Sequence, residues 1–395
     1  MIYSKEMYLL GNKKSSIREM FEYGKKRAAI VGSQNVFDFS LGNPTVSPPT
    51  CVNEEICKLV RKSDPVFLHG YTSAQGDFET RKTIADYING RYNTHFAADN
   101  FYITVGAAAA LSMAFKALIT SNTDEIIAIA PFFPEYKVFV NAAGATLKVV
   151  PPDTVNFQID FNALESMISV NTKAIIINSP NNPSGAVYNK STIQRLADLL
   201  ERKQKEFGNP IFIVSDEPYR EIVYDDIEVP YVTNYYRNTL VCYSYSKSLS
   251  LPGERIGFIL VPNEAYESKQ LYAAICGAGR ALGYVCAPSL FQKVIVKCIG
   301  KTGNIELYKN NRDLLYKGLT ELGYQCFKPD GAFYMLVKSF EKNTENFCEK
   351  AKQVDLLLVS AMDFGCPGYV RVSYCVDSDM IKRSFYAFKK LKDMY

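Results

Sequence analysis

Tryptophan is absent from this chain, and histidine is nearly so: the 395 residues contain only His69 and His95. Zinc sites rely heavily on histidine ligands, and a Ser-His-Asp triad needs a histidine as its base. Both kinds of site are therefore poorly supplied, and no metal site is predicted. We expect each histidine to be structural or exposed, and any catalytic base to be another residue type.

Long apolar runs and paired cysteine motifs are also lacking. No run reaches the roughly 18 apolar residues that a membrane span needs, and the first residues contain no apolar stretch typical of a secretory signal. The ten cysteines are scattered and never form a C-x-x-C motif, so we expect reduced thiols. These features predict a cytoplasmic protein with no membrane partner.

Charge of one sign is not in excess. Lys and Arg number 45 and Asp and Glu number 41, which gives a formal net charge of +4. This balance argues against a nucleic-acid partner. The length of 395 residues exceeds what one core usually holds, so two domains are expected. We predict a large domain at 46–288, and a small domain made of an N-terminal arm, 1–45, together with 289–395.

Short apolar runs alternate with helical stretches through the predicted large domain. Such runs, often β-branched, suit strands buried on both faces, and the intervening helices imply crossovers in a mostly parallel sheet. The runs are 101–104, 126–130, 173–178, 211–214, 240–243 and 256–261. Ligands of such sheets bind beyond the carboxyl ends of the strands, so the polar residues after each run are the candidates for chemistry.

The pattern changes after residue 288. We predict two helices near 289–299 and 304–322, then two strands at 332–337 and 369–374, and a last helix at 378–391. A further helix is predicted near the N-terminus, where Ile17, Met20 and Phe21 follow a plausible N-cap at Ser15. The fold class is therefore α/β, with a smaller α+β domain.

The segment 244–257, Ser-Tyr-Ser-Lys-Ser-Leu-Ser-Leu-Pro-Gly-Glu-Arg-Ile-Gly, lies between two predicted strands. A lysine at the ligand-binding end of a sheet, among hydroxyls and near an arginine, suits an amine that condenses with an aldehyde cofactor. On this interpretation Lys247 is that amine, and Ser244 and Arg255 bind the cofactor phosphate. The alternative is a surface loop with an incidental lysine.

Three further segments follow predicted strands. Asp216, in Ser-Asp-Glu-Pro-Tyr-Arg, could pair with a protonated ring nitrogen, or it could cap a helix. The segment 178–185, Asn-Ser-Pro-Asn-Asn-Pro-Ser-Gly, is rich in turn residues and could be no more than a turn. The segment 104–111 passes through Gly106 into an alanine-rich helix, whose first N–H groups could bind a phosphate.

Together these segments, in this order and spacing, resemble the class I/II aminotransferases of the aspartate aminotransferase superfamily, which have PLP fold type I. The resemblance runs from Leu-Gly-Asn-Pro at 41–44 to Arg-Val-Ser at 371–373. It implies pyridoxal 5′-phosphate as cofactor, with Lys247 as the lysine that binds it covalently. It also implies that Asp216 contacts the ring nitrogen, that Tyr219 and Asn182 contact the 3′ oxygen, and that Phe133 contacts the ring face. The implied phosphate ligands are Ser244, Arg255 and the N–H groups of Ala107 and Ala108, with Ser246 as a weaker candidate.

The resemblance also implies a homodimer and a substrate site. Tyr71 matches a tyrosine that reaches the phosphate in the neighbouring subunit, so active sites would be shared. Arg371 matches the arginine that binds the substrate α-carboxylate, and Gly42 and Asn182 lie where the chain would approach the substrate. Arg280 lies near a position that reads a second carboxylate in some relatives, whereas another such position holds Ala109, so acidic substrates are in doubt.

The predicted function is transfer of an amino group between an L-amino acid and a 2-oxo acid by a ping-pong mechanism, with Lys247, Asp216 and Tyr219 as catalytic residues. A lyase or decarboxylase on the same fold shares every motif and remains the alternative. A regulator that only senses the cofactor is less favoured, because we expect no N-terminal DNA-binding domain before the motifs begin at Gly42. The amino donor and acceptor are not identified by the sequence.

Overall fold

The computed structural model describes residues 2–12 and 15–395, and its centre is a seven-stranded sheet. Across the sheet the strands run in the order β2, β8, β7, β6, β5, β3, β4, and all pairs are parallel except those of β8 with β2 and β7. Their bounds are β2 Phe101–Thr104, β3 Glu125–Ile129, β4 Thr146–Val150, β5 Thr172–Asn178, β6 Phe212–Asp216, β7 Thr239–Ser244 and β8 Gly257–Leu260. The predicted mostly parallel sheet is confirmed.

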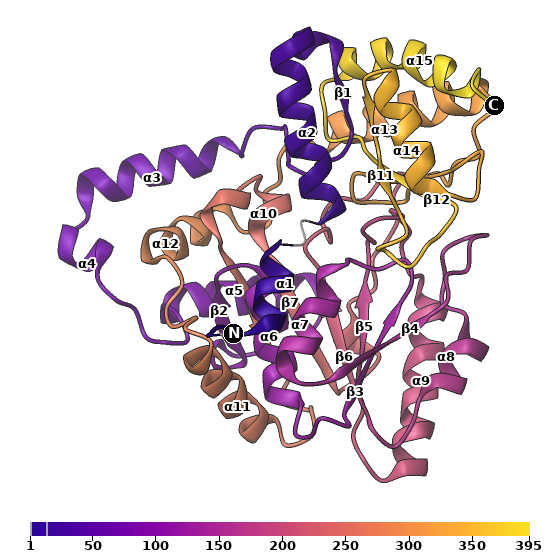
Figure 1. The fold of residues 1–395 in the computed structure, drawn as a ribbon. Coiled ribbons are helices and arrows are strands. Elements are labelled where there is room, and N and C mark those ends of the chain that lie inside the picture. Colours follow the sequence, from indigo (N-terminus) through magenta and orange to yellow (C-terminus); the bar gives the residue numbers. More distant parts are fainter. Residues whose placement is uncertain (1, 13–14) are drawn as a thin grey trace.

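Helices cover both faces of this sheet (Figure 1). Because side chains alternate along a strand, Ile176 of β5 packs in one core cluster and Ile175 and Ile177 pack in another. The first face carries α6 (Ala107–Leu118), α7 (Glu135–Ala143) and α11 (Ser268–Ala281). The opposite face carries α5 (Phe78–Tyr92), α8 (Phe161–Met167), α9 (Lys190–Phe207) and α12 (Ser289–Cys298).

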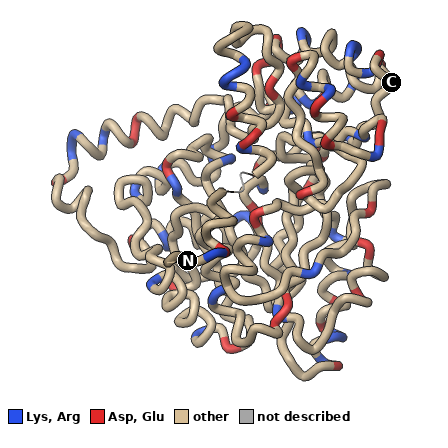
Figure 2. The backbone as a smooth tube through the Cα atoms, viewed as in Figure 1, with Lys and Arg blue, Asp and Glu red and all other residues tan. Residues whose placement is uncertain are grey.

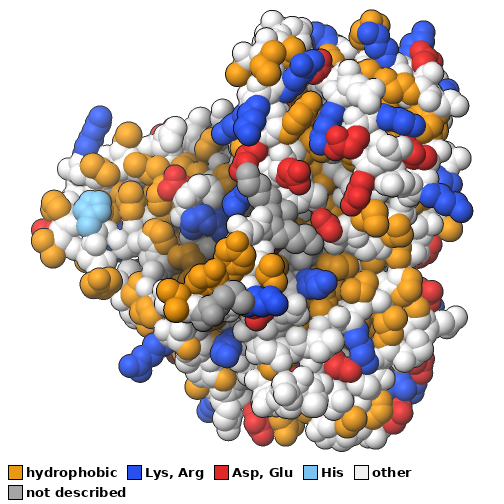
Figure 3. All heavy atoms as spheres, viewed as in Figure 1, with side chains coloured by type: hydrophobic (Ala, Val, Ile, Leu, Met, Phe, Trp, Pro, Cys, Tyr) orange, Lys and Arg blue, Asp and Glu red, His pale blue; other side chains and the backbone are white. Residues whose placement is uncertain are grey.

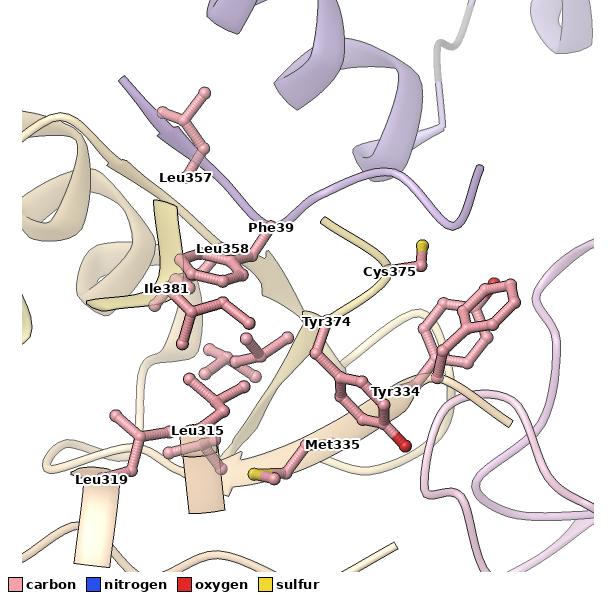
Figure 4. Packing of buried hydrophobic residues seen from close by; sticks show 14 of the residues in the cluster. Phe39, Leu315, Leu319, Tyr334, Met335, Leu357, Leu358, Tyr374, Cys375 and Ile381 are labelled. Carbon is pink, nitrogen blue, oxygen red and sulfur yellow. The ribbon is translucent and has the colours of Figure 1, made fainter. Parts of the chain in front are cut away.

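The smaller unit combines the N-terminal arm with the C-terminal part of the chain. Strand β1 (Phe37–Asp38) pairs in parallel with β10 (Leu356–Leu357), and β11 (Val359–Ser360), β12 (Tyr369–Ser373) and β9 (Tyr334–Lys338) form an antiparallel sheet in that order. Its helices are α2 (Ser16–Val31), α13 (Ile305–Glu321), α14 (Thr344–Gln353) and α15 (Ser378–Lys392). Figure 4 shows Phe39, Leu358 and Ile381 packed together in its core.

Most predicted elements are found within a few residues of their expected bounds, including α2, whose N-cap Ser15 accepts a hydrogen bond from the N–H of Arg18. Strand β4 was not predicted, because its edge position leaves Thr146 exposed and gives it no buried apolar run. The division at residues 45/46 and 288/289 stays a prediction. No helix in the described part of the chain is long and apolar enough to cross a membrane.

Two remaining segments lie at the surface. Helix α1 (Lys5–Asn12) has no buried residue, and α3 (Thr50–Lys62) with α4 (Pro65–His69) lies at one side of the molecule in Figure 1, packed against α12. Basic and acidic side chains are interspersed along the backbone in Figure 2 and over the face drawn in Figure 3. Both histidines are exposed and all ten cysteines are free.

Candidate active site

Three neighbouring parallel strands end at one edge of the large sheet, and the predicted polar residues lie there. Asn178, the last residue of β5, is in register with Asp216, the last residue of β6, and Ser244 ends β7 beside them. A cavity of about 280 Å³ opens at this edge. Its lining includes every predicted site residue except Tyr71 and the candidate Arg280, namely Gly42, Ala107, Ala108, Phe133, Asn182, Asp216, Tyr219, Ser244, Ser246, Lys247, Arg255 and Arg371.

Lys247 enters the cavity from α10 (Tyr245–Ser248), a single turn that follows β7 directly. Its amine Nζ donates a hydrogen bond of 2.7 Å to the carbonyl oxygen of Gly42. The pKa of Lys247 is lowered to about 8, chiefly by burial; the positive charges of Arg371 and Arg255 also lower it, and Cys375 opposes them. More of the amine is therefore neutral near neutral pH than in an ordinary lysine, which makes this side chain a competent nucleophile and base.

Asp216 is 5% exposed and presents two unequal carboxyl oxygens. Oδ2 accepts a hydrogen bond of 2.5 Å from the hydroxyl of Tyr136, whereas Oδ1 has no hydrogen-bond partner among the described residues. Burial raises the pKa of Asp216 to about 7, although the Tyr136 hydrogen bond opposes this and the charge of Glu217 adds to it. A cationic N–H group placed in the cavity would satisfy Oδ1 and favour the carboxylate.

A cradle for an anion lies at the start of α6. Helix N-termini leave N–H groups free for a phosphate, and Ala107 and Ala108 are the first residues of this helix. The hydroxyls of Ser244 and Ser246 lie 2.8 Å apart beside it, and Nη1 of Arg255 donates to Ser246 at 3.4 Å. Gly106 has a φ of +88°, and a Cβ there would come within 2.8 Å of Nη2 of Arg255, so only glycine fits between helix and guanidinium.

On the side of the small unit, Arg371 of β12 brings a second cation into the cavity. It is 1% exposed, and it donates from Nη1 to Oδ1 of Asn182 at 3.2 Å and from Nη2 to the carbonyl oxygen of Ser40 at 2.5 Å. Its Nε has no partner in the described part of the chain. Burial lowers the pKa of Arg371, and no described carboxylate forms an ion pair with it. A buried guanidinium without a counterion is costly, so the site favours an incoming carboxylate.

Two tyrosines and a glycine shape the wall between these groups. The hydroxyls of Tyr219 and Tyr334 lie 2.9 Å apart, and the ring of Tyr334 lies 4.7 Å from the guanidinium of Arg371. A Cβ at Gly42 would overlap the Tyr334 hydroxyl, so the backbone can pass this close only as glycine. The predicted approach of the backbone at Gly42 to the substrate stays a prediction.

Some predicted residues lie elsewhere, and some lining residues were missed. Tyr71 is 99% exposed and outside the cavity of its own chain, and Arg280 is exposed on α11, also outside the lining. Tyr136 was also missed: it does not line the cavity, but it donates a hydrogen bond to Asp216 from a position 80 residues away in the sequence. The missed lining residues are Ile17, Leu111, Phe139, Asn178, Pro218, Pro252 and Tyr334.

The donor set fits pyridoxal phosphate. The cavity offers a lysine amine for the aldehyde, an acidic oxygen without a described partner for the ring nitrogen, and a helix N-terminus with hydroxyls and an arginine for the phosphate. Arg371 remains for a substrate carboxylate. In the described residues no group of three or more acidic, cysteine or histidine side chains is placed to hold a metal ion.

Comparison with known proteins agrees with this chemistry. The family model for aminotransferase class I and II matches residues 34–387. The aspartate aminotransferase of Pyrococcus horikoshii is 30% identical, over 93% of this chain and 92% of that protein, and the aspartate aminotransferase of Thermotoga maritima is 28% identical, over 93% and 94%.

A crystal structure of an aminotransferase from Eubacterium rectale is 66% identical, superposes with a TM-score of 0.98, and covers 100% of this chain and 99% of that one. These matches favour transamination over a lyase or decarboxylase reaction on the same fold. With a family model that spans most of its length, this chain belongs to the class I and II aminotransferases and is a pyridoxal-phosphate-dependent enzyme.

Proposed function

We propose that the residues of this cavity divide the work of transamination between a cofactor half and a substrate half. The observation that carries the proposal is a pair of buried groups that lack partners among the described residues, Oδ1 of Asp216 and Nε of Arg371, in one cavity with Lys247. One is an acceptor and the other a donor. Buried polar groups are nearly always satisfied, so a ligand with a cationic end and an anionic end accounts for both.

In the cofactor half, pyridoxal phosphate supplies an aldehyde that reacts with amines and a ring that accepts electrons. Lys247 would bind it covalently, Asp216 would hold a proton on the ring nitrogen, and Tyr219 and Asn182 would bind the 3′ oxygen. Phe133 would contact the ring. The N–H groups of Ala107 and Ala108, together with Ser244, Ser246 and Arg255, would hold the phosphate.

In the substrate half, Arg371 binds the α-carboxylate with the help of Asn182, and the backbone at Gly42 closes the opposite side. This orientation would present the Cα proton to Lys247. Its amine, with a pKa lowered to about 8, would take that proton as general base once the substrate amine has replaced it. The first substrate would leave as a 2-oxo acid while the cofactor keeps the amino group, and a second 2-oxo acid would then receive that group, which makes the kinetics ping-pong.

The two units meet at this site. Lys247 follows a strand of the large sheet, whereas Arg371 lies on β12 of the small sheet and donates to Asn182 across the boundary. We therefore propose domains at 46–288 and at 1–45 with 289–395, which close around the substrate and exclude water. The scattered cysteines, which form no C-x-x-C motif, support a location in the cytoplasm.

The enzyme is proposed to be a homodimer with shared active sites. Tyr71 is 99% exposed and follows α4, which lies at one side of the molecule (Figure 1). Because a matching tyrosine binds the phosphate in the family that the chain resembles, and because Tyr71 does not line the cavity of its own chain, it is assigned to the phosphate of the second subunit.

Replacement of Lys247 tests the assignment. In Lys247→Ala, the visible absorbance of the lysine-bound cofactor should disappear and turnover should fall to nearly nothing. The matched control is Lys137→Ala, because Lys137 is exposed on α7 outside the cavity lining and should behave like the unaltered enzyme. Normal absorbance, or turnover near that of the control, in Lys247→Ala would show that another group binds the cofactor.

A further inference from the structure

The cations that border the cavity are fully committed by the proposed roles. Within residues 2–12 and 15–395, the positively charged side chains of the lining are Lys247, Arg255 and Arg371. Lys247 serves the reacting amine, Arg255 the cofactor phosphate and Arg371 the α-carboxylate. None of these described cations is left to bind a second carboxylate at the end of a substrate side chain, so such a carboxylate would need a cation from the second subunit.

Apolar side chains from three separate elements form part of the remaining wall. Leu111 lies one helical turn after Ala107 on α6 and is 2% exposed, and Phe139 lies on α7, which begins just after Phe133. Helices α6 and α7 pack against each other, so these side chains share one side of the cavity. Ile17, in the first turn of α2, adds an apolar side chain from the small unit.

We infer that this enzyme uses neutral amino acids with apolar side chains, such as leucine, methionine or phenylalanine, in preference to aspartate or glutamate. The inference rests on the proposed function, because it takes the α-carboxylate to lie at Arg371. A side-chain carboxylate placed against Ile17, Leu111 and Phe139 would lose its hydration without gaining a cation, which is unfavourable. An aliphatic or aromatic side chain there loses only apolar contact with water, which is favourable.

The same reasoning applies to the acceptor. In a ping-pong reaction the donor and the acceptor occupy the same site in turn, so the wall that disfavours glutamate also disfavours 2-oxoglutarate. We expect the preferred acceptors to be neutral 2-oxo acids, such as pyruvate or 4-methyl-2-oxopentanoate.

Single-turnover reactions with the cofactor-loaded enzyme test the preference without an acceptor. The change in cofactor absorbance is followed after mixing with leucine against aspartate, and with methionine against glutamate. Pocket complementarity of this kind discriminates by about a hundredfold, so the apolar member of each pair should have a second-order rate constant about that much higher. Binding of unreactive acids gives a second readout: 4-methylpentanoate should displace the amino acid substrate from the site at a lower concentration than succinate does.

A cation placed in the apolar wall should reverse the preference. Phe139→Arg should raise the ratio of the rate constant for aspartate to that for leucine at least about tenfold. If this variant folds poorly, Ile17→Arg tests the same effect from the other side of the site. The control is Val138→Arg, which adds the same charge to α7 outside the lining and should leave the ratio unchanged.

The outcomes separate this inference from the proposed function. Faster reaction with aspartate and glutamate would overturn the inference alone, and loss of that activity in Arg280→Ala would then identify the residue that reads the second carboxylate. If no amino acid changes the absorbance of bound cofactor, the proposed roles fail and the inference fails with them.

Discussion

Tyr136 and Asp216 are joined by a hydrogen bond of 2.5 Å, in which the phenol donates to Oδ2 and leaves Oδ1 as the carboxyl oxygen without a described partner. The bond spans 80 residues of sequence and links α7 to the end of β6. It fixes which oxygen is available to the cofactor ring. It also lowers the pKa of a carboxyl group whose pKa burial has raised to about 7.

Removal of this phenol should weaken cofactor binding in a pH-dependent way. In Tyr136→Phe the pKa of Asp216 rises above about 7, so less carboxylate is present at neutral pH to pair with the ring nitrogen. A hydrogen bond to a charged group contributes about 1.5–3 kcal/mol, so the dissociation constant at pH 7 should increase roughly tenfold to a hundredfold. Titration of the apoprotein with pyridoxal phosphate from pH 6 to 9 measures this.

The difference should shrink toward pH 9, where Asp216 ionises in both proteins. Tyr188→Phe is the control, because Tyr188 is another buried tyrosine that packs in a core cluster away from Asp216. An identical pH profile for Tyr136→Phe and the unaltered enzyme would remove Tyr136 from any role in cofactor binding.

The raised pKa of Asp216 also predicts how apoprotein stability depends on pH. The folded carboxyl group, with a pKa of about 7, keeps its proton at pH values where the unfolded group, near 3.8, has lost it. The folded state therefore binds more protons between about pH 4 and 7, and this group's contribution to the free energy of unfolding falls as pH rises through that window. Chemical denaturation of the apoprotein at pH 5 and pH 8 measures the change.

Asp216→Asn cannot titrate, so its stability should decrease less from pH 5 to pH 8 than that of the unaltered apoprotein. The expected difference is on the order of a few kcal/mol. Bound cofactor should reduce it, since the ring nitrogen stabilises the carboxylate. Equal pH dependence in both apoproteins would mean that Asp216 ionises normally in the folded state.

Arg371 should lower the pKa of Lys247 as well as bind substrate. Burial lowers the pKa of Lys247 to about 8 and the charge of Arg371 contributes, so Arg371→Gln should move this pKa upward. The rate at which apoprotein captures pyridoxal phosphate should rise with pH as the amine loses its proton, and the midpoint of that rise should shift to higher pH in the variant. Arg280→Gln, which removes an exposed arginine outside the cavity lining, should leave the midpoint unchanged.

The site residues that could be predicted from sequence are those marked by a local pattern, and contacts between residues far apart in the chain could not be predicted. Asp216 and Lys247 were found because each closely follows a buried apolar strand, which is a local signal. Tyr136 and Tyr334 reach Asp216 and Tyr219 across 80 and 115 residues, and no local pattern marks such contacts. Arg371 was placed by resemblance alone, since it meets Asn182 across 189 residues.

The fold shows the same limit. Strands buried on both faces, such as β5 and β6, have continuous apolar runs and were predicted. The edge strand β4 includes the exposed Thr146 and the half-buried Lys148, so its sequence lacks that signature, and its place is set by pairing with β3. The antiparallel direction of β8 likewise could not be predicted from its own residues, because its pairing with β2 and β7 sets that direction.

Shared active sites predict recovery of activity in a mixed dimer. Tyr71→Phe chains, which should bind the phosphate less well, and Lys247→Ala chains, which lack the reacting amine, are co-refolded or exchanged. In a heterodimer both lesions fall in one site and the other site is intact, so activity should exceed that of either parent. A mixture no more active than its parents, or a monomer by light scattering at working concentration, would mean that Tyr71 does not complete a second subunit's site.

Arg371→Lys should weaken every substrate by a similar factor, whatever its side chain. Arg371 is fully buried, has an Nε with no described partner, and lies in the cavity with Lys247, so its role is to bind the group that all amino acids share. Lysine keeps the positive charge but cannot present two parallel donors to a carboxylate. The lost contact contributes about 1.5–3 kcal/mol, so KM should increase roughly tenfold to a hundredfold for leucine, methionine and phenylalanine alike, whereas the absorbance of bound cofactor should not change.

Steady-state kinetics with a series of donors measures the effect of Arg371→Lys. The control is Arg91→Lys, because Arg91 is an exposed arginine on α5. If only donors with acidic side chains lost affinity, Arg371 would be reading the side chain, and the α-carboxylate would have to be bound elsewhere in the cavity.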